Sequence, residues 1–268
     1  MEQLDGAVAV ITGGGSGIGR GTALALAAAG THVVVTDIDA ERASSVAEEA
    51  SGSGAACVGA ALDVTRQEDF DRAHGLALER FGRVDIVMNN VAMIAVGLPE
   101  YIPMEGWERS VSTNLLSVVR SNTTFLPGLL EQGHGHIVNT ASTAGLFAYA
   151  YERLPYSATK AGVIALSEAL ALYVRPHGVG VTCLCPGPVA TRIGESMSMS
   201  GPAVRLRSPG KDLAVLAPEA VGEMVRDAIV DNRFLLLTHP ELQDVLVARA
   251  QDPEAFLARQ LATIAEDD

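Results

Sequence analysis

Hydrophobic residues fall into short continuous runs that alternate with longer segments in which apolar positions recur at helical spacing. The apolar runs predict strands at 7–12, 32–37, 55–63, 84–90, 136–142, 178–186 and 233–238. The segments between them predict helices at 20–30, 41–50, 67–82, 105–126, 156–175 and 218–231. Strands that are apolar throughout are buried on both faces, which is typical of a parallel sheet with helices on each side.

No linker splits the chain into separate units, so we expect one α/β domain over 1–268 with a doubly wound, seven-stranded parallel sheet. The one long irregular stretch is 187–216, which is rich in Gly, Pro, Ser and Met. A loop of that length in a compact domain is usually either a lid or disordered, and we expect a substrate lid. Residues 239–268 predict a helical C-terminal extension.

Composition narrows the class of partner. The 19 basic and 32 acidic residues give a net charge of −13, which disfavours nucleic acid and anionic membranes as partners. No apolar stretch is long enough to predict a membrane span. The polar, acidic start of the chain does not resemble a signal peptide.

The three cysteines are too few for a disulfide framework, which favours a reducing, cytoplasmic location. Cys183 and Cys185 form a C-x-C pair inside an apolar strand, where core packing is favoured over metal ligation. The six histidines suggest no metal site either, so we expect none.

A glycine-rich turn follows the first predicted strand and opens a helix. It reads "TGGGSGIGRG" over 12–21, with Gly13, Gly17 and Gly19 in the pattern T-G-x-x-x-G-x-G. Glycines at such a turn allow a pyrophosphate to approach the helix N–H groups, whose dipole favours an anion. The turn therefore predicts a Rossmann-like dinucleotide site, and the alternative is a β-α turn without a ligand.

An acidic residue ends the second predicted strand. Asp37 lies 18 residues beyond Gly19, where a carboxylate accepts hydrogen bonds from the adenosine ribose and repels a 2′-phosphate. Ser16 and Ile38 carry no positive charge, and Arg42 lies on the following helix. The alternative is that Asp37 caps this helix, but Asp39 is better placed for the cap. We therefore expect NAD as the cofactor.

From residue 5 to about 240 the chain resembles the classical short-chain dehydrogenases/reductases. The motifs occur in the family's order: "TGGGSGIG" (12–19), Asp37, "LDVT" (62–65), "NNVA" (89–92), Asn114, Ser142, "YSATK" (156–160) and "PGPV" (186–189). The resemblance implies an NAD site formed by Gly13, Ser16, Gly17, Ile18, Gly19, Asp37, Asp63, Val64, Asn90, Tyr156, Lys160, Pro186, Gly187, Val189 and Thr191. It implies that Asp63 binds the adenine ring and that Val189 and Thr191 hold the nicotinamide carboxamide. Val91 and Ala92 depart from the family's Ala-Gly.

"YSATK" holds Lys160, one of only two lysines beside 17 arginines; the other is Lys211. Tyr156 and Lys160 are four residues apart and share one helix face. A tyrosine with its ordinary pKa of about 10 is a poor base near neutrality, and a nearby ammonium favours the phenolate. A compact ammonium also fits where a planar guanidinium does not. By resemblance, Lys160 binds the nicotinamide ribose, Ser142 binds the substrate oxygen and Asn114 holds a water of a proton relay.

These residues predict an oxidoreductase that transfers a hydride between NAD(H) and a secondary alcohol or ketone. Apolar and aromatic residues of the expected pocket favour a hydrophobic substrate: Met93, Ile94, Leu146, Phe147, Tyr149, Tyr151, Met197 and Met199. Arg153 and Arg192 are candidates for holding a carboxylate. Two alternatives remain, namely an NADP-dependent ketoacyl-type reductase and a non-catalytic NAD-binding regulator.

The family also implies a homodimer or homotetramer built through helices 105–126 and 156–175. The second of these helices is apolar nearly all round, which predicts burial on more sides than the sheet covers. The apolar strand 233–238 and the C-terminal extension are candidates for a further contact, because an edge strand this apolar needs covering.

Overall fold

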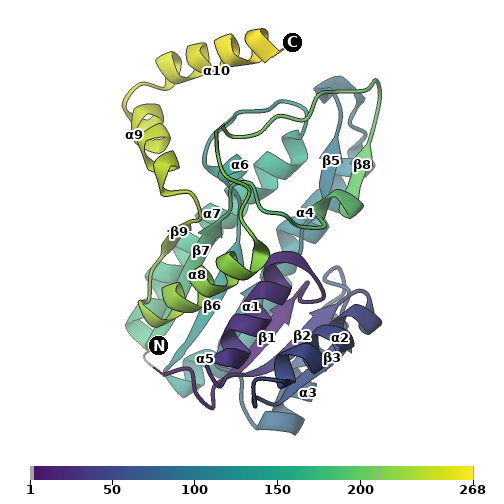
Figure 1. Ribbon diagram of the computed structural model, residues 1–268, viewed down its shortest axis with the longest axis vertical. Helices are drawn as coiled ribbons and strands as arrows, with labels where there is room; N and C mark the ends of the chain where they lie inside the picture. The colour runs from purple at the N-terminus through teal and green to yellow at the C-terminus, as the bar shows by residue number, and fades with distance from the viewer. Residues whose placement is uncertain (1–2, 211, 268) are drawn as a thin grey trace.

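The computed structural model describes residues 3–210 and 212–267; Lys211 and the outermost residues of the expected domain and extension lie outside this range. The seven expected strands form one parallel sheet in the order β3-β2-β1-β4-β6-β7-β9 (Figure 1). They are β1 (Val8–Thr12), β2 (His32–Asp37), β3 (Cys57–Ala61), β4 (Ile86–Asn89), β6 (Gly135–Thr140), β7 (Val179–Cys185) and β9 (Leu235–Leu237). The expectation of a doubly wound parallel sheet is confirmed.

Each face of the sheet has its own helical layer. Helices α1 (Gly17–Ala28), α2 (Ala40–Ser51) and α8 (Pro218–Val230) share one apolar cluster with Ala9 and Ile11 of β1. Helices α3 (Gln67–Phe81), α5 (Leu116–Gln132) and α7 (Leu154–Val174) bury their apolar residues on the other face, where α3 and α5 meet Val10. Successive strand residues point to opposite faces, which is why β1 is apolar from Val8 to Ile11 and has a buried polar residue only at its end, Thr12.

The strand order reverses between β1 and β4. The chain winds from β1 outward to β3 and then returns to the other side of β1 with β4. At such a switch point the loops that leave the two central strands diverge and form a crevice at the carboxyl ends of the strands. The glycine turn after β1 and the Asn89-Asn90 segment at the end of β4 both lie there.

The expected helix 105–126 is two helices in the structure. Helix α4 (Met104–Asn114) ends at Leu115, whose backbone angles are φ −114° and ψ −54°, and α5 follows to Gln132. No Gly or Pro lies between residues 110 and 120, so the sequence carries no glycine or proline stop signal at this break. The break lies directly after Asn114, whose buried side chain is held by other segments, as described below.

The expected lid, 187–216, is more ordered than its composition suggested. It contains a 3₁₀ turn, η3 (Ile193–Ser196), and a short strand, β8 (Met197–Met199). Strand β8 pairs in parallel with β5 (Ile94–Val96), which follows β4, and Ser200 N donates to Val96 O at 2.9 Å. A second sheet thus anchors the lid to the segment after β4, a non-local pairing that no local pattern predicted.

The C-terminal extension consists of η4 (Pro240–Leu242), α9 (Gln243–Gln251) and α10 (Pro253–Asp267). Figure 1 shows α10 well separated from the sheet. Its Phe256 packs against Phe147 with a ring-centroid distance of 6.2 Å, so the extension is attached to the loop that precedes α7.

The stretch Leu154–His177, which is α7 with the 3₁₀ turn η2 (Arg175–His177), is long and apolar enough to cross a membrane by length and composition alone. In the structure it packs on the sheet and carries the buried Tyr156 and Lys160. Packing against the core of this domain therefore accounts for the apolar residues on one side of this stretch.

Candidate active site

A cavity of about 1010 Å³ runs along the carboxyl ends of the strands. Fourteen of the fifteen residues expected to bind the cofactor line it, and Gly19 is the exception. Of the four expected catalytic residues, Ser142, Tyr156 and Lys160 line the cavity and Asn114 does not. The sequence motifs thus converge on one site, although they are spread over 179 residues from Gly13 to Thr191.

The glycine turn forms one wall of this cavity. Gly13 and Gly17 adopt left-handed conformations with φ values of +61° and +54°. A Cβ at Gly19 would collide with the carbonyl oxygen of Gly13, so this glycine lets the first turn of α1 pack under the loop. The turn leaves the start of α1 open toward the cavity, as a pyrophosphate requires.

The acidic end of the cavity is formed by Asp37 at the end of β2. Its carboxylate accepts hydrogen bonds from Gly15 N and Asp39 N, both at 3.1 Å. Asp39 accepts from Glu41 N at 3.1 Å and from Arg42 N at 3.2 Å, so Asp39 is the cap of α2. Asp37 therefore shapes the turn and still presents a carboxylate to the cavity.

Arg42 also lines the cavity beside Asp37. Its guanidinium is 3.1 Å from Asp39 Oδ2 and 3.2 Å from Glu195 Oε2 of the lid. The guanidinium of Arg42 is thus already paired with the carboxylates of Asp39 and Glu195.

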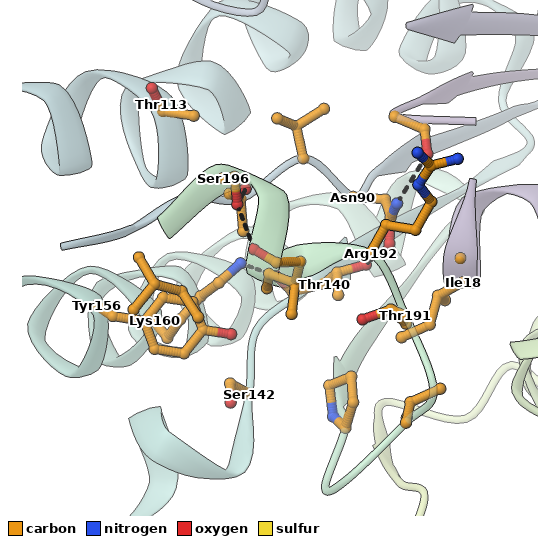
Figure 2. Close-up of a pocket in the computed structure, with 18 of the residues that line it drawn as sticks. Ile18, Asn90, Thr113, Thr140, Ser142, Tyr156, Lys160, Thr191, Arg192 and Ser196 are labelled. Atoms are coloured by element: carbon orange, nitrogen blue, oxygen red, sulfur yellow. Dashed lines mark hydrogen bonds between the residues drawn. The ribbon is translucent and has the colours of Figure 1, made fainter. Parts of the chain in front are cut away.

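Tyr156 and Lys160 lie one turn apart on α7 and point into the same part of the cavity (Figure 2). Lys160 is 1% exposed, and its Nζ donates to the carbonyl oxygen of Thr140 at 2.6 Å. The ammonium nitrogen is 5.8 Å from the centroid of the Tyr156 ring. The lysine is therefore fixed between the end of β6 and the tyrosine.

Burial shifts the pKa of Tyr156 and the pKa of Lys160 in the directions that favour the neutral side chain. It raises the pKa of Tyr156 to about 12, against which a hydrogen bond with Ser142 acts in the opposite direction. It lowers the pKa of Lys160 to about 8. Desolvation disfavours the phenolate and the ammonium alike, so each group depends on its neighbours for the charge that it carries.

Ser142 follows β6 and is the N-cap of the short helix α6 (Thr143–Leu146). Its Oγ accepts from Ala144 N at 3.1 Å. This bond fixes the serine side chain beside Tyr156 without using its hydroxyl proton. Ser142 is thus positioned to donate to an oxygen that lies next to the phenol.

Asn114 holds the β4–β5 segment against α7. Its Oδ1 accepts from Met93 N at 2.8 Å, and its Nδ2 donates to Met93 O at 3.0 Å and to Thr159 Oγ1 at 3.1 Å. All these groups are buried, so the amide is fully used in a contact between three segments. The role in a proton relay that the resemblance implies for Asn114 stays a prediction.

Only two of the eight residues expected to form the substrate pocket line the cavity, Ile94 and Tyr149. Phe147 packs instead with Leu242 and Phe256 of the extension, and Leu146 packs partly against the same cluster. Met93 is buried, Met197 packs against the cluster that contains Ile94 and Tyr156, and Met199 is largely exposed. Tyr151 accepts a hydrogen bond from Arg207 Nη2 at 3.3 Å.

Several cavity residues have no signal in the sequence. Thr140 contributes a backbone carbonyl, which any residue would supply. Arg207 comes from the lid and lies 54 residues after Arg153 in the sequence, yet both residues line the cavity. Arg109 and Thr113 of α4 line it as well. No motif spacing connects these positions, because only the folded chain brings them together.

Val91 and Ala92, which replace the family's Ala-Gly, both line the cavity. Val91 Cγ2 lies 2.9 Å from where a Cβ on Gly13 would be, so the valine covers the glycine turn. Ala92 O accepts from Ser196 Oγ of the lid at 3.2 Å.

The residues present fit a dinucleotide cofactor. The glycine turn lines the cavity together with the Asp37 carboxylate, which suits a ribose. The Lys160 ammonium lies beside Tyr156 in the same cavity. Asn90 supports the cradle, since its Nδ2 donates to Gly13 O at 3.2 Å. No group of three or more His, Cys, Asp or Glu side chains able to hold a metal ion occurs among the described residues.

Comparison with known proteins agrees with this geometry. A family model described as short chain dehydrogenase matches residues 7–200. A cyclohexanol dehydrogenase of Acinetobacter sp. is 34% identical over 226 residues, which cover 84% of this chain and 88% of the relative. An L-fucose dehydrogenase of Bos taurus is 34% identical over 198 residues, or 74% of this chain and 71% of the relative.

A solved structure has the same fold. It is a short chain dehydrogenase/reductase from Burkholderia phymatum in complex with NAD, 31% identical, with a TM-score of 0.84. The match covers 95% of this chain and 96% of that one. The likeness therefore extends beyond residues 7–200, which the family model matches.

Proposed function

This chain belongs to the short-chain dehydrogenase family, and on that premise we propose that it is an NAD-dependent enzyme that interconverts a secondary alcohol and a ketone. Its named relatives are dehydrogenases, which places the chain among the oxidoreductases that act on a CH–OH group. The dependence on NAD, the catalytic residues and the class of substrate are the parts that we propose.

One observation carries the proposal. Ser142, Tyr156 and Lys160 meet on one wall of a cavity whose far end holds the glycine turn and Asp37. A dinucleotide that lies along the cavity with its adenosine at Asp37 has its nicotinamide beside Tyr156. A binding protein without catalysis has no need of a buried lysine next to a buried tyrosine, because burying both groups costs free energy.

Each of these side chains has its own role in the proposed reaction. Ser142 donates a hydrogen bond to the substrate oxygen, and Tyr156 Oη takes the hydroxyl proton. NAD supplies the hydride acceptor, so the carbinol carbon loses a hydride as its oxygen loses a proton. The Lys160 ammonium favours the phenolate, and its anchor on Thr140 O keeps that charge close to the ring.

The cavity favours NAD over NADP. Asp37 repels a 2′-phosphate, and Arg42 is faced by Asp39 and Glu195 instead of being available to such a phosphate. The rival proposal, an NADP-dependent ketoacyl-type reductase, requires Arg42 to leave both carboxylates.

The decisive experiment follows absorbance of the reduced cofactor with NAD⁺ or NADP⁺ and a panel of secondary alcohols that includes cyclohexanol. We expect turnover of hydrophobic secondary alcohols with NAD⁺ preferred. Tyr156→Phe is the matched control, which should bind NADH and lose turnover by roughly 10²- to 10⁴-fold. If NADP⁺ is preferred, the ketoacyl-type reductase is favoured. Binding of NADH with no turnover of any alcohol would favour the regulator.

Assembly and location belong to the proposal as well. Leu172 and Tyr173 on α7 are exposed, as are Leu116 and Val119 on α5. These two helices therefore offer the apolar surface that a homodimer or homotetramer would bury. A cytoplasmic location stays a prediction from the cysteine content.

A further inference from the structure

An ionic cluster lies where the lid meets the start of α7. Glu152 is fully buried, and its Oε1 accepts from Arg153 Nη2 at 2.9 Å and from Arg207 N at 2.8 Å. Its Oε2 accepts from Arg207 Nη1 at 3.3 Å. Arg153 Nη2 also donates to Arg207 O at 2.6 Å. The Glu152 carboxylate thus accepts hydrogen bonds from the guanidinium groups of both Arg153 and Arg207.

Both arginines line the same cavity as Tyr156. Their side chains are only 12% exposed for Arg153 and 4% exposed for Arg207. Arg153 lies 5.6 Å from the centroid of the Tyr149 ring, and Tyr149 is one of the two expected pocket residues that do line the cavity. The charge of Arg153 also lies near enough to lower the pKa of Tyr156 against the larger raising effect of burial. These contacts place Arg153 in the substrate half of the cavity.

Three further arginines line the cavity, and two of them, Arg42 and Arg192, differ from this cluster in their partners and exposure. Arg42 and Arg192 both pair with Glu195, and all three side chains are well exposed to solvent. Arg153 Nε is buried and has no hydrogen-bond partner among the described residues. A buried guanidinium that shares its carboxylate with a second guanidinium is costly unless a further acceptor balances its charge.

A purely structural role explains part of the cluster. The backbone N and O of Arg207 both bond to residues 152 and 153, which fastens the lid to the start of α7. That clamp uses the Glu152 carboxylate and a single Nη group of Arg153. It accounts for neither the unpaired Nε nor the position of a second positive charge on the wall of the cavity.

We propose that Arg153, positioned by Glu152 and Arg207, binds a carboxylate of the substrate, so that the enzyme acts on secondary alcohols that carry an acid group. This inference rests on the proposed function and names its substrate class. Arg153 Nη2 is occupied by Glu152 and Arg207 and its Nε is buried, so a substrate carboxylate would accept from Nη1. The low exposure of the site strengthens that charge-assisted contact. Tyr149 and Ile94 would then face the apolar part of the same substrate.

The test uses pairs of secondary alcohols that differ only in a terminal carboxylate or its primary amide, in a series of increasing spacer length. In the wild-type enzyme we expect kcat/KM to favour the acid at one spacer length. Arg153→Met should reduce the acid-to-amide ratio roughly 10- to 100-fold, and Arg153→Lys should restore part of it. Because both compounds are measured on one preparation, partial misfolding cancels in the ratio.

Arg192→Met is the matched control, since it removes the other arginine for which a carboxylate contact was expected from the sequence. Its acid-to-amide ratio should equal that of the wild type. A ratio that falls in Arg192→Met and not in Arg153→Met would overturn the assignment. An amide used as well as the acid at every spacer length would overturn the substrate class.

A second readout separates this inference from the proposed function. The corresponding keto acids and keto amides are added with NAD⁺, and the rise in the melting temperature is measured without any need for turnover. We expect the acid to stabilise the wild type more than the amide does, and Arg153→Met to lose that difference. If no alcohol is oxidised, the proposed function fails while the melting data still decide the site. Equal stabilisation by acid and amide in the wild type would refute the arginine site.

Discussion

Lys160 Nζ donates a 2.6 Å hydrogen bond to the carbonyl oxygen of Thr140, a residue on the neighbouring strand β6. The bond fixes a buried ammonium at the point where β6 meets α7, 5.8 Å from the centre of the Tyr156 ring. A lysine head fits this narrow place. A guanidinium would have to displace the strand end or the tyrosine, which explains why a chain so rich in arginine has a lysine here.

Lys160→Arg should therefore lose activity although it keeps the charge. We expect kcat to fall by roughly 10²-fold or more, because the planar group cannot keep both the Thr140 contact and the space beside Tyr156. Steady-state turnover with NAD⁺ checks this, and circular dichroism shows whether the fold is kept. Wild-type turnover in the arginine variant would refute the steric explanation.

Burial of Lys160 predicts a pH dependence of stability. Its pKa is lowered to about 8 from 10.5, so the unfolded chain binds more protons than the folded one between these values. The cost of the buried charge is full below about pH 8 and disappears as the pH rises through 10.5. The free energy of unfolding of the wild type should thus rise relative to Lys160→Met by about 3 kcal/mol over this window.

Urea unfolding of both proteins across the window measures that difference. Titrating groups remote from Lys160 are common to the two proteins and cancel, whereas Cys183 and Cys185 interact with its charge. A difference that stays constant with pH would show that Lys160 keeps an ordinary pKa in the fold.

Asp37→Asn should narrow the preference for NAD⁺ over NADP⁺. The amide oxygen can still accept from Gly15 N or from Asp39 N, so one of the two turn contacts is kept while the repulsion of a 2′-phosphate is removed. We expect the ratio of kcat/KM values for the two cofactors to fall about tenfold or more. Asp63→Asn, which also lines the cavity, is the control and should leave the ratio unchanged. An unaltered ratio in Asp37→Asn would mean that another residue sets the preference.

Gly19→Ala should weaken cofactor binding through packing alone. Its Cβ would collide with Gly13 O, and relief requires the turn to move away from α1. We expect the Kd for NADH to rise about tenfold or more, measured by fluorescence titration. Gly75→Ala in α3 is the matched control, because a Cβ there meets nothing within 4 Å. That control should bind NADH normally and gain about 0.5–1 kcal/mol of stability.

Leu172→Glu should disrupt the proposed assembly. This leucine on α7 is 83% exposed in the single chain, and Tyr173 next to it is exposed as well. A charge at a buried apolar contact costs several kcal/mol, so we expect light scattering to show a smaller species than the wild type. Leu257→Glu on α10 tests the contribution of the C-terminal extension in the same way. A wild type that is already monomeric at micromolar concentration would contradict the prediction.

The sequence by itself determined the architecture. Continuous apolar runs mark the strands, so the seven strands and their parallel arrangement followed from the pattern of residues. Strands β1, β4 and β7 are buried along their whole length, while the edge strands β3 and β9 are only partly buried. Local spacing also placed Tyr156 and Lys160 on one helix face and assigned the α2 cap to Asp39, since both depend on backbone geometry within one turn.

Only the tertiary structure decided which atoms meet. The anchor of Lys160 on a backbone carbonyl, the use of Asn114 by Met93 and Thr159, and the pairing of β5 with β8 join segments far apart along the chain. Phe147 was expected in the pocket and packs instead on Phe256, whereas Arg207 reaches the cavity without any motif. The local sequence determines which face of a helix or strand is apolar. Which element covers that face depends on how segments far apart in the sequence pack together.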